Sequence, residues 1–144
     1  MFAILTCSFA SLSTIKTAYK LIGLLLSIHK FHPNKPIYLF TDEATSILLN
    51  RLPTELQHLL RIEICLDKYT SCDRQTMEAD GSLKEFWKNK ALIMLKALEE
   101  KKDVLFLDSD IILTGEITEI NNSFKLGLSP QFINDKHRRS TGHY

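Results

Sequence analysis

Asp108 and Asp110 are separated by a single residue, Ser109, within residues 104–113, a stretch that is otherwise almost wholly apolar. In an extended chain, residues i and i+2 project to the same side, so we expect the two carboxylates to point together. Two like charges so close in apolar surroundings repel each other and are poorly solvated. A divalent cation relieves both problems, and carboxylates whose remaining positions are filled by water and phosphate suit Mg²⁺ or Mn²⁺. The spacing therefore predicts a metal site at Asp108 and Asp110.

A second explanation of the acid pair is structural: one aspartate begins a turn and the other caps a helix. It accounts comfortably for one acid and poorly for two. The pair also follows residues 104–107, a predicted buried strand, and open α/β sheets bind ligands at the carboxyl ends of their strands. We therefore favour the metal site.

Lys90 is the second candidate. It lies seven residues after Leu83, a spacing that at 3.6 residues per turn returns to almost the same face of a helix. It therefore falls on an apolar stripe, between Trp87 and Met94. A lysine there either extends its charged end to the rim or meets an anion. Because this helix leads directly into the strand before the acid pair, a phosphate contact and simple solvation both stay open.

Polar groups also end the first two predicted strands. The hydroxyl and backbone groups of Thr6, Cys7 and Ser8 would face the same crevice if the first strand is central. Serine and threonine are also common at strand ends as helix caps, so this signal is weak alone. Asp42, after the second strand, is a helix N-cap by default and a base or ribose contact by hypothesis.

The alternation of apolar runs and helical periodicity predicts an α/β fold, with a mostly parallel, Rossmann-like sheet flanked by helices. A polar, aperiodic segment, 67–81, is expected to be a loop, and Ser82 with Glu85 predicts a capping box for the helix that follows. The predicted strands are 2–9, 36–41, 62–66, 104–107 and 124–128, and the main predicted helices are 15–29, 44–51 and 82–101.

Composition sets limits on the class of protein. The 144 residues carry 18 Lys and Arg against 17 Asp and Glu, a balance that gives no support for nucleic-acid binding. No apolar run approaches the roughly 20 residues of a membrane-spanning helix. The apolar segment 2–12 has no positive residue before it, as a signal peptide would. Three cysteines without a C-x-x-C spacing fit a reducing compartment, so we expect a soluble cytoplasmic protein.

With these features in place, the chain resembles glycosyltransferases of the GT-A fold, which use nucleotide diphosphate sugars. The resemblance rests on the order of Phe86-Trp87-x-x-Lys90, then Lys96-Ala97-Leu98, then the strand letters VLFL and the DxD motif Asp108-Ser109-Asp110. The opening letters FAILT and the later letters LGLSP resemble the family's first strand and the strand after its DxD motif.

This resemblance implies transfer of a sugar, often from a UDP-sugar, to a hydroxyl of a glycan, protein or small-molecule acceptor, with Mn²⁺ or Mg²⁺ as cofactor. Asp110 would ligate the metal, and Asp108 would ligate it or hold the ribose, which makes this pair the catalytic residues. The metal would neutralise the departing diphosphate. The remaining nucleotide-binding positions implied by the resemblance are Lys90 at the phosphates, Ser109 in the motif, and Thr6, Cys7, Ser8 and Asp42 around the base and ribose.

The length of chain after the motif departs from the family. Only 34 residues follow Asp110, so we expect residues 1–144 to be a single nucleotide-sugar-binding domain, truncated at its carboxyl end. Two alternatives stay open. The letters LFLDSDIIL also resemble the first motif of haloacid-dehalogenase-type phosphatases, in which Asp108 would be a nucleophile and Asp110 a general acid, although that motif normally opens its domain. A half-domain that binds nucleotide and metal without turnover is the other alternative.

Overall fold

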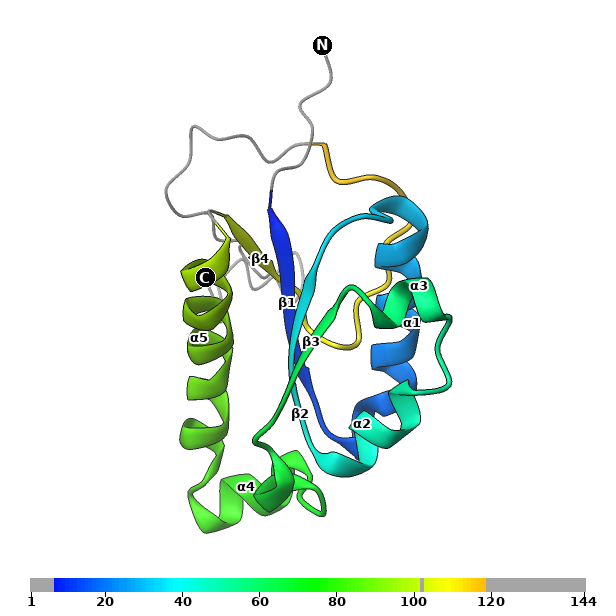
Figure 1. The fold of residues 1–144 in the computed structure, drawn as a ribbon. Helices are drawn as coiled ribbons and strands as arrows, with labels where there is room; N and C mark the ends of the chain where they lie inside the picture. Colours follow the sequence, from blue (N-terminus) through cyan, green and yellow to red (C-terminus); the bar gives the residue numbers. More distant parts are fainter. Residues whose placement is uncertain (1–6, 102, 119–144) are drawn as a thin grey trace, which may run out of the picture. The chain divides into compact units, whose positions relative to one another are not determined.

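The computed structural model describes residues 7–101 and 103–118, and the elements below belong to one compact unit, Thr6–Glu116. Figure 1 shows their arrangement. In chain order they are β1 (Ser8–Ser13), η1 (Ile15–Thr17), α1 (Ala18–Phe31), β2 (Ile37–Thr41), α2 (Glu43–Leu49), α3 (Thr54–Gln57), β3 (Leu60–Ile64), η2 (Asp67–Tyr69), α4 (Arg74–Asp80), α5 (Leu83–Glu100) and β4 (Val104–Phe106).

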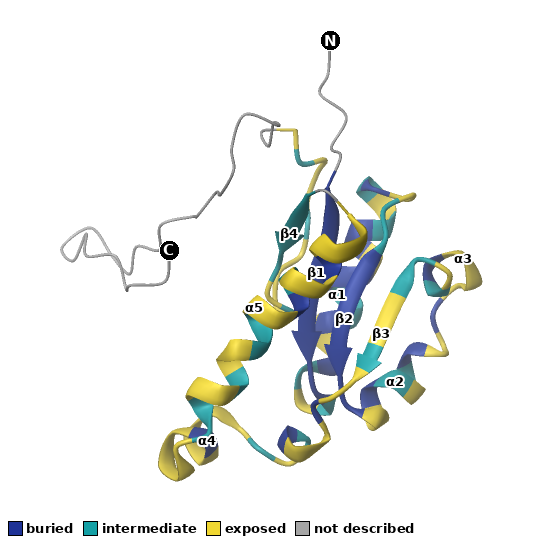
Figure 2. Ribbon diagram, turned by 60° about the vertical axis from the view of Figure 1, so that its left-hand side comes forward, coloured by how far each residue is buried: buried dark blue, intermediate teal, exposed yellow. Residues whose placement is uncertain are grey.

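The sheet has four strands in the order β3-β2-β1-β4, and every pairing is parallel. The two middle strands, β1 and β2, are buried along their whole length, whereas β3 and β4 are only partly buried (Figure 2). The predicted α/β class, with a parallel sheet flanked by helices, is confirmed. The strand expected at 104–107 is confirmed as β4, but it is half-buried and not buried in the part of the chain that the structure describes.

Helices cover both faces of the sheet. Helix α5 lies on one face, and α1, α2 and α3 lie on the other (Figure 1). On the α5 side, Tyr38 and Phe40 of β2 pack with Ile93 and Ala97 of α5 in one hydrophobic cluster. Because side chains alternate along a strand, the neighbouring strand residues face α1, whose Leu21, Leu24 and Leu25 are fully buried. This two-sided burial is the main stabilising contribution, at roughly 1.5–3 kcal/mol for each large side chain.

The first strand lies later in the chain than predicted. The sequence suggested a strand over 2–9 with Ser11 or Ser13 as a helix cap, but β1 extends from Ser8 to Ser13. The serines tolerate burial because their hydroxyls find backbone partners: Ser11 Oγ donates to the Leu107 carbonyl at 2.6 Å, and Ser13 Oγ donates to the Thr14 carbonyl at 3.1 Å. These polar residues therefore belong to the strand.

The segment predicted as a loop, 67–81, contains η2 and α4. Asp73 caps α4 by accepting a hydrogen bond from the Thr76 N–H at 2.8 Å, and Gly81, with a φ of 79°, ends it in the left-handed conformation. An aspartate cap and a glycine after the last turn are ordinary helix signals, so this short helix was visible in the sequence and was missed.

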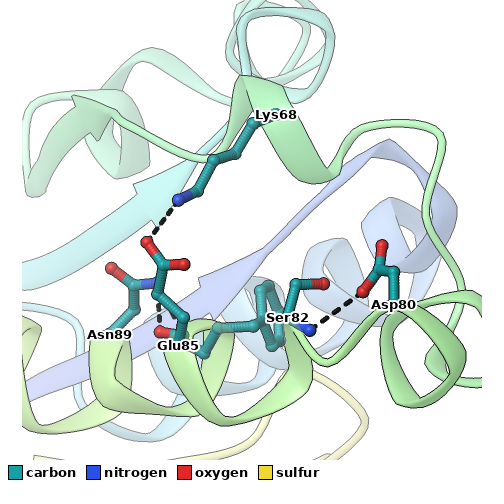
Figure 3. Close-up of polar contacts among 6 residues, drawn as sticks. Lys68, Asp80, Ser82, Glu85 and Asn89 are labelled. Carbon is teal, nitrogen blue, oxygen red and sulfur yellow. Dashed lines mark hydrogen bonds and ion pairs between the residues drawn. The ribbon is translucent and has the colours of Figure 1, made fainter.

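The predicted capping box of α5 is wrong. Ser82 has helical backbone angles and makes no side-chain cap bond. Instead its N–H donates to Asp80 Oδ1 at 2.9 Å, while Glu85 pairs with Lys68 Nζ at 2.5 Å (Figure 3). The helix itself is confirmed, because α5 covers almost the whole predicted span, 82–101.

The packed face of α5 is displaced around the helix from the predicted apolar stripe, which comprised Leu83, Phe86, Trp87, Ala91, Met94, Leu95 and Leu98 and left out Ile93 and Ala97. Ile93 and Ala97 are its buried residues, and Leu83, Phe86 and Met94 pack against the core in part. Trp87, Leu95 and Leu98 are exposed, and so is Ala91. The sheet covers only one side of the helix, so a stripe spread around more than a third of the circumference cannot all be buried.

Helices predicted at 15–29 and 44–51 are confirmed as η1 with α1 and as α2, and the strands at 36–41 and 62–66 correspond to β2 and β3. The predicted strand at 124–128 lies outside the described residues. Among the helices of 7–101 and 103–118, none combines the length and apolar character that crossing a bilayer requires.

Candidate functional site

The carboxyl ends of β4 and β1 meet at the acidic motif. Phe106, the last residue of β4, lies opposite Ala10, and the Leu107 N–H continues the pairing by donating to the Ala10 carbonyl at 2.9 Å. Asp108 therefore follows directly where β4 separates from β1. The chain runs outward from β1 to β2 and β3, then returns through α5 to β4 on the other side of β1. Such a reversal of strand order is where open α/β sheets bind ligands.

Asp108 and Asp110 lie in a turn and not in an extended segment. The Ile111 N–H donates to the Asp108 carbonyl at 3.1 Å, and the chain turns at Ser109 and Asp110. Aspartate is favoured at the first position of such a turn. The expectation that the two carboxylates project together from an extended chain is therefore wrong, and both residues are exposed and not enclosed by apolar groups.

Lys90 reaches the motif from α5. Its Nζ lies 2.7 Å from Asp108 Oδ1, and the two side chains are 36% and 54% exposed. The aliphatic part of this lysine also brings Nζ to 5.4 Å from the ring centre of Phe106. Of the two possibilities for Lys90, it meets an anion, here a carboxylate of its own chain. At this exposure the pair contributes roughly 0–1 kcal/mol, so little free energy opposes its opening.

The segment after the motif lies against α1. The Leu113 N–H donates to Ser27 Oγ at 3.0 Å, and a Cβ added at Gly23 would meet the Ile112 side chain at 3.5 Å. The second distance is an ordinary van der Waals contact, so the Ile112 side chain lies beside α1 at Gly23. The acidic turn is thus supported on both sides, by α5 through Lys90 and by α1 through the residues that follow it.

Asp42 is fully buried at the end of β2 and caps α2. Its Oδ1 accepts the Thr45 N–H and its Oδ2 accepts the Ile15 N–H, each at 3.0 Å. Burial by itself raises the pKa of Asp42, but the hydrogen bonds from Thr45 and Ile15 outweigh it, and the pKa is held below its usual value. The cap role is confirmed. A contact with a bound base or ribose would require this buried network to open.

Cys7 and Ser8 lie at the amino ends of the parallel strands, whereas Asp108 follows the carboxyl end of β4. Ser8 is the first residue of β1 and lies opposite Val104, the first residue of β4. Both the Ser8 N–H and its hydroxyl donate to the Asp103 carbonyl, at 2.9 and 3.2 Å. The expectation that Cys7 and Ser8 border the ligand crevice is wrong, because the strand lies later in the chain than predicted. Thr6 is outside the described residues.

Ser11 and Ser13 occupy the carboxyl end of β1, with Thr14 directly after it, and none of the three was predicted to be a neighbour of the site. Ser11 is bonded to Leu107, the residue before Asp108. The sequence does show Ser11 and Ser13 as polar residues at alternate positions of an apolar run, which places both on one face of a strand. Of these hydroxyls, that of Ser11 lies next to the start of the acidic turn.

The donor set at the turn fits a cation that shares its coordination with phosphate and water. Asp108 and Asp110 supply carboxylate oxygens, and Mg²⁺ is commonly held by one or two carboxylates plus substrate phosphates. Ser109, half-buried between them, adds a hydroxyl. Within residues 7–101 and 103–118, no three His, Cys, Asp or Glu side chains gather into a closed metal cage. A cation held by Asp108 and Asp110 would need phosphate and water to complete its coordination.

Comparison of the chain with protein-family models, curated proteins and solved structures found no match. The features of this chain that bear on function are the exposed acidic turn, the lysine that reaches it, and their position where the strand order reverses.

Proposed function

We propose that this chain is the nucleotide-sugar-binding part of a GT-A-type glycosyltransferase, which transfers a sugar from a nucleotide diphosphate sugar, a UDP-sugar in the simplest case, to an acceptor hydroxyl. The observation that carries the proposal is the Lys90–Asp108 pair at the carboxyl end of β4, beside β1. It combines a cation and carboxylates where a parallel sheet of this order offers a crevice.

Each residue has a role that its position supports. Asp108 and Asp110 provide oxygen donors for the cation, and Lys90 can exchange its carboxylate partner for a phosphate oxygen. Mn²⁺ or Mg²⁺, when bound, stabilises the negative charge that develops on the departing diphosphate. The flexible stem of Lys90 allows this exchange without a change in the helix that carries it. The Ser109 hydroxyl lies within the same turn and is available to the nucleotide.

The overall charge is consistent with this arrangement. Lys and Arg exceed Asp and Glu by one residue, so a general basic surface for polyanions has no support in the composition. Binding of a diphosphate would instead depend on one cation and a few placed side chains. Such binding is specific to the ligand's geometry, because the cation is useful only where phosphate completes its coordination.

The decisive experiment is calorimetry of UDP binding with and without Mn²⁺, on the unaltered chain and on Asp110→Asn. We expect binding that requires Mn²⁺ and that Asp110→Asn weakens by about tenfold or more, since a carboxylate that binds a cation is lost. Glu99→Gln removes the same charge from an exposed position on α5 and serves as the matched control. Unchanged UDP affinity in Asp110→Asn, with the fold intact, would contradict the proposal.

Product analysis on the same samples distinguishes the alternatives. Hydrolysis or transfer from a UDP-sugar supports the glycosyltransferase. Metal-dependent UDP binding without turnover supports the half-domain that only binds. Release of phosphate from a small phosphomonoester, with an aspartyl-phosphate at Asp108, would support a phosphatase instead.

A further inference from the structure

Strand β3 presents an open edge. It pairs with β2, from Ile37 opposite Leu60 to Thr41 opposite Ile64, and with no other strand in the described part of the chain. Its apolar residues are not fully covered, since Ile62 is 38% exposed and Ile64 is 47% exposed. Figure 2 shows this strand at the border of the buried sheet. An edge of this kind is a template for pairing with another strand.

The backbone groups that face outward can be identified from the bonds to β2. The Ile37 N–H donates to the Leu59 carbonyl at 2.9 Å, and the Cys65 N–H donates to the Thr41 carbonyl at 3.0 Å. In a parallel ladder, alternate residues direct both backbone groups to the same neighbour. Odd-numbered residues of β3 therefore face β2, and Leu60, Ile62 and Ile64 direct their backbone groups outward. The Leu60 carbonyl accepts a long hydrogen bond, 3.4 Å, from Nη1 of the Arg61 side chain. A backbone N–H of a pairing strand can replace this donor.

Read backwards, β3 places apolar residues opposite apolar ones and its arginine opposite its glutamate. We propose that β3 pairs antiparallel with β3 of a second copy of this chain, centred on Ile62. In this register Ile62 lies opposite the partner's Ile62, and Leu60 lies opposite the partner's Ile64. Both are pairs whose backbone groups face outward, so they form the hydrogen-bonded positions of an antiparallel ladder.

The charges select this register. Arg61 lies opposite the partner's Glu63 at the positions where antiparallel side chains approach most closely, and opposite charges there are favourable. Centring the pairing on Arg61 would put arginine against arginine, and centring it on Glu63 would put glutamate against glutamate. Lys96 of α5 already pairs with Glu63 on the same face of the sheet, so in the dimer Glu63 lies between two cations.

The dimer would form a continuous sheet through both copies. Its two-fold axis is perpendicular to the sheet, so α5 of both copies lies on one face. β4 and the acidic turn lie at the far side of each sheet, beyond β1, and stay accessible. Five paired residues make a small interface beside the roughly 1,600 Å² of a standard one. We therefore expect a dimer that dissociates on dilution.

Sedimentation velocity of the whole chain over a range of concentrations tests this. The expected mass rises from 16.5 kDa toward twice that value. Arg61→Glu and Glu63→Arg each place like charges opposite one another and should weaken dimerisation by about tenfold. An equimolar mixture of these two variants restores both opposite-charge pairs, so it should form a heterodimer with near-normal affinity.

Two further variants isolate the edge. Ile62→Pro removes an N–H that faces outward and not toward β2, a substitution that edge strands tolerate, and it should abolish the dimer. Lys84→Glu reverses an exposed charge on α5 and should leave dimerisation unchanged. Circular dichroism confirms that each variant is folded.

A chain that stays monomeric at every concentration overturns the proposal, as does a dimer that none of the β3 variants weakens or a mixture that fails to recover. Hydrogen exchange on the unaltered chain covers the case in which a variant does not fold. The amides of Leu60, Ile62 and Ile64 should exchange more slowly in concentrated than in dilute solution. Equal exchange at both concentrations would also overturn it.

Discussion

Lys90 and Asp108 form an ion pair, 2.7 Å between Nζ and Oδ1, that connects the middle of α5 to the turn after β4. They are 18 residues apart in the chain, one within the helix and the other just after the strand that follows it. Helix α5 lies on one face of the sheet. Strand β4, which pairs with β1, follows this helix in the chain and runs parallel to β1. The pair therefore depends on the parallel return of β4, which places a cation and two carboxylates in one exposed region.

Lys90→Met keeps the aliphatic stem and removes the charge. We expect UDP affinity in the presence of Mn²⁺ to fall by about tenfold or more, because a charge-assisted contact to phosphate is lost. Binding of Mn²⁺ alone should not weaken, because Asp108 is released from its competing lysine. Titration calorimetry measures both affinities.

Lys96→Met is the matched control, since Lys96 is a half-exposed lysine of the same helix that pairs with Glu63. It should leave UDP affinity unchanged. Equal UDP affinity in Lys90→Met and the unaltered chain would show that Lys90 does not contact the phosphates.

Asp42→Ala tests the buried cap at the end of β2. The substitution removes the cap of α2 and leaves the Ile15 and Thr45 N–H groups without their acceptor, so we expect a loss of roughly 2–3 kcal/mol in the free energy of unfolding. Because the pKa of Asp42 is lowered on folding, its contribution is present above the pKa of the unfolded chain, about 4, and is lost as pH falls below it. Urea denaturation at pH 7 and at lower pH measures both effects.

The exposed cap of α4 supplies the comparison for Asp42. Asp73→Ala removes a similar N-cap bond at the surface and should lower the free energy of unfolding by less than Asp42→Ala does. Equal losses in the two variants would mean that burial of the Asp42 network adds nothing to its contribution.

Ile93→Ala tests which side of α5 packs on the sheet. Ile93 is 1% exposed, so the substitution should destabilise the fold by about 2–5 kcal/mol through lost burial and a cavity. Leu95→Ala, at a residue that is 59% exposed, should change stability by about 0.5 kcal/mol or less. Thermal and urea denaturation of the two variants give the comparison, and a larger loss in Leu95→Ala would reverse the assignment of the packed face.

Local patterns were sufficient for the class of fold and for most elements. Apolar runs such as that of β2 and the periodicity of α1 depend on near neighbours, so they are visible in the sequence. The position of β1 was not, because Ser11 and Ser13 look like caps when their partners are unknown. Ser11 is accommodated by the Leu107 carbonyl, 96 residues away, and no local rule includes such a partner.

For the candidate site, local patterns identified the residue types: an acid pair after an apolar strand, and a lysine on the preceding helix. The tertiary structure decided which of them meet. Ser109 and Asp110 form a turn and not an extended segment, the later start of β1 puts Ser8 at the amino end of that strand, and the Ile15 N–H binds Asp42 within a buried cap. Each outcome depends on strand register or on a hydrogen bond between distant segments, which is settled only when the whole sheet is packed.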